Sequence, residues 1–416
     1  RQMCIRDRRR GTGCALAGNA DGFPLGGCTA AGACRHADAL AGARGMKPGT
    51  AQKRAATTTL ADTARALSTQ LAADPDTATR SLVAILAKHG LLAAGIVPTG
   101  SGEGGFAFHM PWQGLADTLE CIGAVDLSLA RLLEGHVNVL QLVHLYGSAA
   151  QQERVADLAL SGELLGIWGA DDTPPVTLVC EGAVWRMSGA KRYASGVGVV
   201  HSALIPVFTG PAPLLPLVEV RTADRMDLSG WNHGGMERSL SGRYSFEGVS
   251  LSGAELVGNP GDYRREPHFV GGIWRCAAAQ LGAVTAIVAI MRSTLEERGH
   301  DAHPLQKQRL GRAAMQARTA RLWVHDAAAR VEAAASSRNA DAIKEATALA
   351  AYARLVTEES ALAVIELAQR AIGLSGFHRT HPVSIRAADL AVYLRQANPD
   401  AILLEHAVTV SESIGA

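Results

Sequence analysis

The sequence predicts an α+β protein in which a small β domain lies between two helical domains. Residues 56–163 and 263–416 are rich in Ala and Leu, with apolar residues at the three- and four-residue spacing of amphipathic helices. Residues 164–262 instead contain short extended-type runs separated by Gly, Pro, Asn and Asp. The chain of 416 residues is also longer than one ordinary hydrophobic core requires, which favours two or three domains.

Residues 1–55 are expected to be a disordered or artefactual extension. They begin with the polar, basic run RQMCIRDRRR, and the Gly-, Ala- and Cys-rich stretch that follows has no apolar period. The first octet resembles read-through of a sequencing adapter, which makes Met46 a candidate start. We therefore expect the folded chain to begin near Thr57.

Each predicted domain is assigned from local patterns. In 56–163, segments such as TTTLADTARALSTQLAAD and DTATRSLVAILAKHG predict amphipathic helices. In the middle, strands are predicted at 185–187, 193–194, 201–207 and 244–249, and strands this short favour a small antiparallel barrel or sandwich. Helices predicted at 271–298, 304–335, 341–372 and 385–395 would form a C-terminal four-helix bundle.

Composition and charge exclude several kinds of partner. The net charge of +1 gives no reason to expect nucleic acid. The most apolar run, 276–291, is shorter than the roughly 18–20 residues that span a bilayer, so we expect a buried helix whose small residues let neighbours approach closely. The seven cysteines show no tight zinc spacing, so no metal is expected, and their usage is typical of a reduced, cytoplasmic protein.

The order of domains and several motifs resemble the acyl-CoA dehydrogenase family of flavoproteins. The run MSGAKRYASG resembles the family strand whose aromatic and hydroxyl residues contact the flavin, which implies this role for Tyr193 and Ser195. Upstream, LLGIWGADD stands where the family has another flavin-facing segment, which implies contacts from Leu165, Ile167 and Trp168. Without the resemblance, an ordinary β-hairpin with an exposed tyrosine would account for the first motif.

Two C-terminal segments resemble the part of the family that holds the flavin phosphates. ERGHDAHPLQKQRLGRAAM places Arg298 and Gln306 at the family's Arg and Gln positions, and the planar fork of Arg suits a pyrophosphate. RAIGLSGFHRTHPV resembles a Gly-rich turn that reaches the flavin of a neighbouring subunit, through Gly373 and Gly376. The resemblance therefore implies FAD as cofactor and a homodimer or homotetramer.

The catalytic glutamate of the family has no counterpart. Its two known positions correspond here to Ala397 and to Trp274, which precedes Arg275. Neither side chain can accept a proton, so the catalytic residue is unknown, with Asp400 as a candidate if the loop is shifted. Trp274 and Arg275 remain candidate substrate-binding residues.

Three functions are compatible with this pattern. The first is an FAD-dependent oxidoreductase that acts on a CH–CH group of an acyl thioester or related small molecule and passes electrons to an acceptor. The second is a flavin-dependent monooxygenase on the same fold, supplied by a reductase. The third is a catalytically inactive structural homologue.

Overall fold

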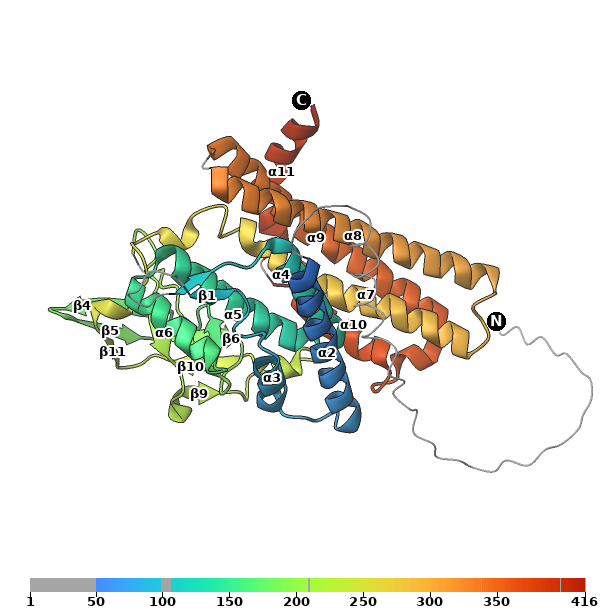
Figure 1. Cartoon of the computed structure of the whole chain (residues 1–416), viewed down its shortest axis with the longest axis horizontal. Helices are drawn as coiled ribbons and strands as arrows, with labels where there is room; N and C mark the ends of the chain where they lie inside the picture. The colour runs from blue at the N-terminus through green and yellow to red at the C-terminus, as the bar shows by residue number, and fades with distance from the viewer. Residues whose placement is uncertain (1–49, 99–105, 209, 338, 397, 416) are drawn as a thin grey trace, which may run out of the picture.

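The computed structural model of the chain describes residues 50–98, 106–208, 210–337, 339–396 and 398–415 (Figure 1). Residues 1–49, which hold most of the predicted extension, lie outside the described residues. Helix α2 already begins at Thr50, so helical structure starts earlier than the expected Thr57.

Where the structure describes it, the N-terminal part consists of helices and one two-stranded sheet. Its helices are α2 (Thr50–Ala73), α3 (Thr79–Lys88), α4 (Trp112–Val125), α5 (Leu127–Tyr146) and α6 (Ala149–Leu160), and its strands are β1 (Ile96–Pro98) and β2 (Phe106–Phe108). Asp126 begins α5 by accepting a hydrogen bond from the amide of Leu129. Ser148 and Gln151 form a capping box at the start of α6, which satisfies two amides that the helix leaves free.

Among its described residues, the middle part contains three small three-stranded sheets. Their strand orders are β6-β10-β9, β11-β5-β4 and β3-β7-β8. The strands are β3 (Leu164–Ile167), β4 (Thr177–Glu181), β5 (Val184–Ser188), β6 (Ala190–Ala194), β7 (Val200–Leu204), β8 (Leu217–Glu219), β9 (Met226–Asp227), β10 (Gly242–Ser245) and β11 (Val249–Leu251). All pairs in these sheets are antiparallel except β3 with β7, which departs from the purely antiparallel expectation.

The single strand predicted over 244–249 is wrong, because the chain turns between two sheets there. Strand β10 ends at Ser245 and β11 begins at Val249. Gly248 has φ of +69°, a conformation that glycine adopts without steric cost, and the amide of Val249 bonds to the carbonyl of Phe246. The chain thereby passes from the sheet of β6 to the sheet of β5.

The C-terminal part is a bundle of long helices, shown in yellow to red in Figure 1. The helices are α7 (Trp274–Glu297), α8 (Pro304–Ser337), α9 (Ala340–Ile372), α10 (Pro382–Tyr393) and α11 (Pro399–Gly415). The first four confirm the predicted helices to within a few residues, whereas α11 was not predicted. The segment Gly271–Glu297 is long and apolar enough to span a membrane, but 83% of its most apolar window is buried inside the protein, as in a core helix.

Helices α4 and α7 are in backbone contact. A Cβ atom added to Gly282 would lie 2.1 Å from the carbonyl oxygen of Glu120, and one added to Gly123 would lie 2.2 Å from that of Ala279. No real side chain tolerates such a distance, so glycine at both positions lets the helices meet. This confirms that the small residues of 276–291 serve close packing.

His136 ties strand β3 to the helical part. Its Nδ1 accepts a hydrogen bond from the amide of Leu165, so its Nε2 carries the proton that it donates to the carbonyl oxygen of Leu92. Complete burial lowers the pKa of His136 to about 4, which keeps the ring neutral, as this pairing requires. The strand that leads into the candidate site is therefore fixed against α5.

Candidate functional site

A cavity of about 860 Å³ lies where the middle part meets α5, α7 and α10. Its size falls within the roughly 300–1,000 Å³ of typical small-molecule sites. Apolar lining residues include Leu142, Ile273 and Val392, while polar side chains from three regions converge on the same space. These features make it the candidate active site.

Three of the predicted flavin-contacting residues line one wall of this cavity: Ile167, Tyr193 and Ser195. Tyr193 is 52% exposed, and its ring lies edge-on to Trp231 with centroids 5.6 Å apart, so an aromatic face remains available to a ligand. The Ser195 hydroxyl lies 3.0 Å from that of Ser241. This wall thus combines an aromatic surface with a positioned hydroxyl group.

Two other predicted contacts, Leu165 and Trp168, are absent from the described lining of the cavity. Leu165 is buried in the core between α5 and the β3-β7-β8 sheet. Trp168 is 1% exposed, packs on Tyr244 and donates a hydrogen bond of 2.9 Å to the carbonyl oxygen of Ser195. Ile167, the last residue of β3, reaches the cavity, while Trp168, which follows the strand, supports Ser195 through its hydrogen bond.

The candidates near the missing base have different positions. Trp274 is completely buried outside the described lining, whereas its neighbour Arg275 lines the cavity. Asp400 is exposed in the first turn of α11 and is likewise absent from the described lining, so it does not replace the missing base in this arrangement. Ala397 lies outside the described residues.

The remaining predicted residues form a second cluster around the end of α7. Arg298 donates hydrogen bonds of 2.9 Å to the carbonyl oxygen of Ile372 and 2.8 Å to the hydroxyl of Ser375, and Gln306 donates to the carbonyl oxygen of Ala371. Gly373 and Gly376 lie in the short 3₁₀ turn that follows α9.

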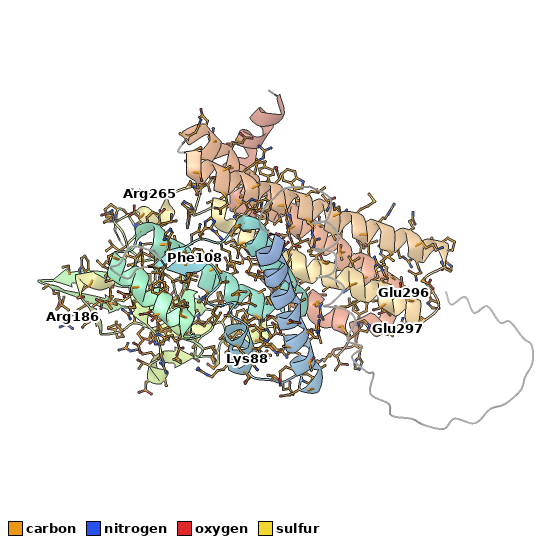
Figure 2. All side chains as sticks on the ribbon, viewed as in Figure 1. Lys88, Phe108, Arg186, Arg265, Glu296 and Glu297 are labelled. Atoms are coloured by element: carbon orange, nitrogen blue, oxygen red, sulfur yellow. The ribbon has the colours of Figure 1, made fainter. Side chains whose placement is uncertain are left out.

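This second cluster does not share the cavity. Arg275 lies in the first turn of α7 and Arg298 follows its last residue, so about 35 Å of helix separates them at 1.5 Å per residue. Figure 2 shows Glu296 and Glu297 toward one end of the molecule and Arg186 of β5 toward the opposite end. Within one chain, the predicted flavin residues therefore form two separate groups.

The cavity also contains an ion pair on α5 that sequence reasoning missed. The Nη1 of Arg131 lies 2.8 Å from the Oε2 of Glu134, and both side chains are almost completely buried. Asn138 donates a hydrogen bond to the other carboxylate oxygen of Glu134. Burial opposes the charge on Arg131, but Glu134 and neighbouring groups raise the pKa of the guanidinium overall. The sequence signal for this ion pair was a row of polar residues on one face of an otherwise apolar helix. Gln141 continues that row at helical spacing.

His268 was also missed, although it lines the cavity beside Arg275. Burial and the positive charge of Arg275 lower the pKa of His268 to about 4, so the imidazole is neutral near pH 7. Its Nδ1 is buried without a hydrogen-bond partner among the described residues. Burial similarly raises the pKa of Tyr263, another lining residue, to about 12.

Buried polar contacts hold the other cavity walls in place. The carboxylate of Asp389 on α10 accepts a hydrogen bond of 2.6 Å from the amide of Met236, which joins α10 to the loop that carries Ser239 and Ser241. Burial and the nearby charge of Asp126 raise the pKa of Asp389 to about 6.

Comparisons with known proteins identify the fold. No family model and no curated protein matches the sequence. Among solved structures, a nitrososynthase from Micromonospora carbonacea var. africana has a TM-score of 0.72 at 18% identity, over 89% of this chain and 98% of that one. A probable acyl-CoA dehydrogenase from Mycobacterium abscessus has a TM-score of 0.71 at 17% identity, over 86% and 98%.

A third similar structure is TdsC from a Paenibacillus species, solved with FMN and indole. Its TM-score is 0.67 at 18% identity, over 85% of this chain and 96% of that one. The chain therefore has the α+β fold of acyl-CoA dehydrogenases, which confirms the predicted fold class and the resemblance read from the motifs.

Proposed function

We propose that the protein is a flavin-dependent oxidoreductase whose flavin ring lies against Ile167, Tyr193 and Ser195. The observation that carries this proposal is the convergence of these three residues on one wall of the 860 Å³ cavity. The space and its mixed apolar and polar lining suit a ring system together with a small substrate. The FMN bound to TdsC, which has the same fold, supports the same assignment.

The chain's own residues would position and polarise this cofactor. Tyr193 offers an aromatic face, and Ser195 can accept a hydrogen bond from the polar edge of the ring. Its own proton goes to Ser241, because Ser241 donates to Ser239 and Ser239 donates to the carbonyl oxygen of Met236. Bound flavin would supply the two-electron chemistry. The protein's part is to orient the ring and to keep the substrate beside it.

For the reaction, we propose oxygen-dependent oxidation rather than dehydrogenation of an acyl thioester. Dehydrogenation needs a base at the α-carbon, and Glu134, the sole carboxylate in the described lining, is already engaged by Arg131 and Asn138. Trp274 occupies one family base position. The monooxygenase TdsC among the similar structures supports this choice.

The cofactor assignment predicts a yellow protein whose flavin depends on Tyr193. Tyr193→Ala should weaken flavin binding about tenfold or more, because stacking and ring burial are lost. The matched control is Tyr352→Ala, on α9 and absent from the described lining of the cavity. Fluorescence titration of both variants with FMN and FAD checks this, and equal affinity in the two variants would contradict the assignment.

The reaction is tested on the flavin-loaded protein. We expect straight-chain acyl-CoA thioesters to reduce the flavin very slowly under anaerobic conditions. A reductase that supplies reduced flavin should instead support oxygen-dependent conversion of a small substrate. Fast anaerobic reduction by a thioester would establish dehydrogenation and overturn the monooxygenase proposal.

We also propose that a homodimer or homotetramer completes the flavin site, with FAD spanning the two groups of predicted residues. The second cluster lies beside strongly exposed apolar side chains that a partner subunit would cover: Leu305, Met315, Leu374 and Phe377. Arg298 and the turn at Gly373 and Gly376 would then reach the pyrophosphate of the partner's flavin.

This assembly predicts a dimer or larger species in sedimentation velocity. Leu374, which is 89% exposed, should be buried at the interface, so Leu374→Asp should shift the protein toward monomer and lower FAD content together. Leu160→Asp, an exposed position on α6, is the control. A flavin-loaded monomer that is unaffected by Leu374→Asp would exclude the shared site.

A further inference from the structure

Arg275 is a buried cation that faces the cavity, and no described carboxylate forms an ion pair with it. It is 2% exposed, and its Nη1 donates to the carbonyl oxygen of Gly272 while its Nη2 donates to the side-chain oxygen of Gln141. Its Nε has no hydrogen-bond partner among the described residues. All its described acceptors are neutral, so its charge is not compensated by an ion pair.

A buried charge without an oppositely charged partner reduces the stability of the folded protein. Burial lowers the pKa of Arg275, and the negative charges of Glu332 and Glu134 only partly oppose this effect. The described lining contains three arginines and one glutamate, so it has an excess of positive charge. Arg131 forms an ion pair with Glu134, and Arg395 forms one with Glu358, which lies outside the described lining. Of the three described lining arginines, Arg275 therefore lacks an ion pair.

The neighbouring His268 adds a second unsatisfied polar atom at the same place. Its buried Nδ1 has no described partner, and the ring is close enough to Arg275 for that charge to affect its titration. A neutral imidazole can hold a proton on either nitrogen, so it can donate to an anion bound at Arg275. His268 and Arg275 thus place two buried polar atoms without a described partner beside one cavity, where a bound ligand could satisfy both.

We propose that Arg275 binds the anionic group of the substrate, and that the substrate class is small organic anions such as carboxylates, sulfinates and sulfonates. The planar guanidinium suits all three groups, and Phe269, Ile273 and Val392 would contact the apolar remainder. The role of this anion as a substrate rests on the proposed function, whereas the anion-binding site itself does not. The phosphate of a flavin shares this chemistry and is the other source of an anion.

The test compares benzoate with its neutral analogue benzamide by isothermal titration calorimetry on the purified full-length protein. We expect benzoate to bind about 10- to 100-fold more tightly, the range of a charged hydrogen bond. Arg275→Gln should remove this preference, and Arg275→Lys should keep part of it. Arg395→Gln is the matched control, because Arg395 also lines the cavity but is exposed and paired with Glu358.

Several results would overturn the proposal. Equal affinity of the unmodified protein for benzoate and benzamide would contradict it, and this result does not depend on the folding of any variant. Preserved preference in a folded Arg275→Gln protein would do the same. If Arg275→Gln weakens FMN but not riboflavin, and benzoate shows no preference, the residue holds the flavin phosphate instead.

The two proposals can fail separately. Benzoate preference that depends on Arg275 in a protein that binds no flavin would support the anion site and refute the proposed function. A flavin-loaded protein that binds benzoate and benzamide equally would refute the anion site and leave the flavin assignment standing.

Discussion

Replacing Gly282 with alanine should destabilise the protein by about 3 kcal/mol or more, the upper range for overpacked cores. The new Cβ would lie 2.1 Å from the carbonyl oxygen of Glu120 and 2.8 Å from the amide nitrogen of Ala124. Both atoms are backbone, so no side chain can move aside, and α4 and α7 must separate. The N-terminal turn of α7 also lines the cavity, so the same change should weaken ligand binding.

The matched control for this prediction is Gly311→Ala on α8. A Cβ at Gly311 meets no atom within 4 Å. Alanine there should stabilise the helix by up to about 1 kcal/mol through its higher helix propensity. Urea unfolding followed by circular dichroism measures both variants. If Gly282→Ala unfolds at the same urea concentration as Gly311→Ala, the helices are not held in backbone contact.

The fold class and most helices could be predicted because their signals are local. Apolar periodicity located α7, α8, α9 and α10 to within a few residues, and the small residues of α7 correctly indicated close packing. Helix α11 was missed, although Pro399 begins it and Asn398, with φ of +44°, marks the break before it. The parallel pairing of β3 with β7 depends on contacts between distant segments, which periodicity does not contain.

The candidate site was predictable where a motif specifies a local conformation. Tyr193 lies on β6 and Ser195 follows the last residue of that strand, so the motif keeps them close together and both line the cavity. Trp168 and Trp274 were assigned by position along the chain alone, and their burial depends on which neighbours cover them. The row of polar residues on α5 was visible in the sequence, but only the folded chain shows that it faces a cavity rather than solvent.

Removing the carboxylate of Glu134 should destabilise the protein strongly. Glu134→Leu leaves Arg131 as a nearly buried cation without its partner 2.8 Å away, and breaking a buried ion pair in this way typically costs about 3–5 kcal/mol. Asn138 loses its hydrogen-bond acceptor at the same time. Urea unfolding of the purified variant measures the loss.

The matched control is the double variant Arg131→Leu with Glu134→Leu, which removes both charges together. Well-packed apolar residues often replace a buried ion pair at little cost, so the double variant should regain most of the lost stability. That recovery would separate the cost of an unpaired cation from a general loss of packing in α5. A single variant as stable as the parent protein would show that Glu134 is not required to neutralise Arg131, and would make its carboxylate available as the base that dehydrogenation requires.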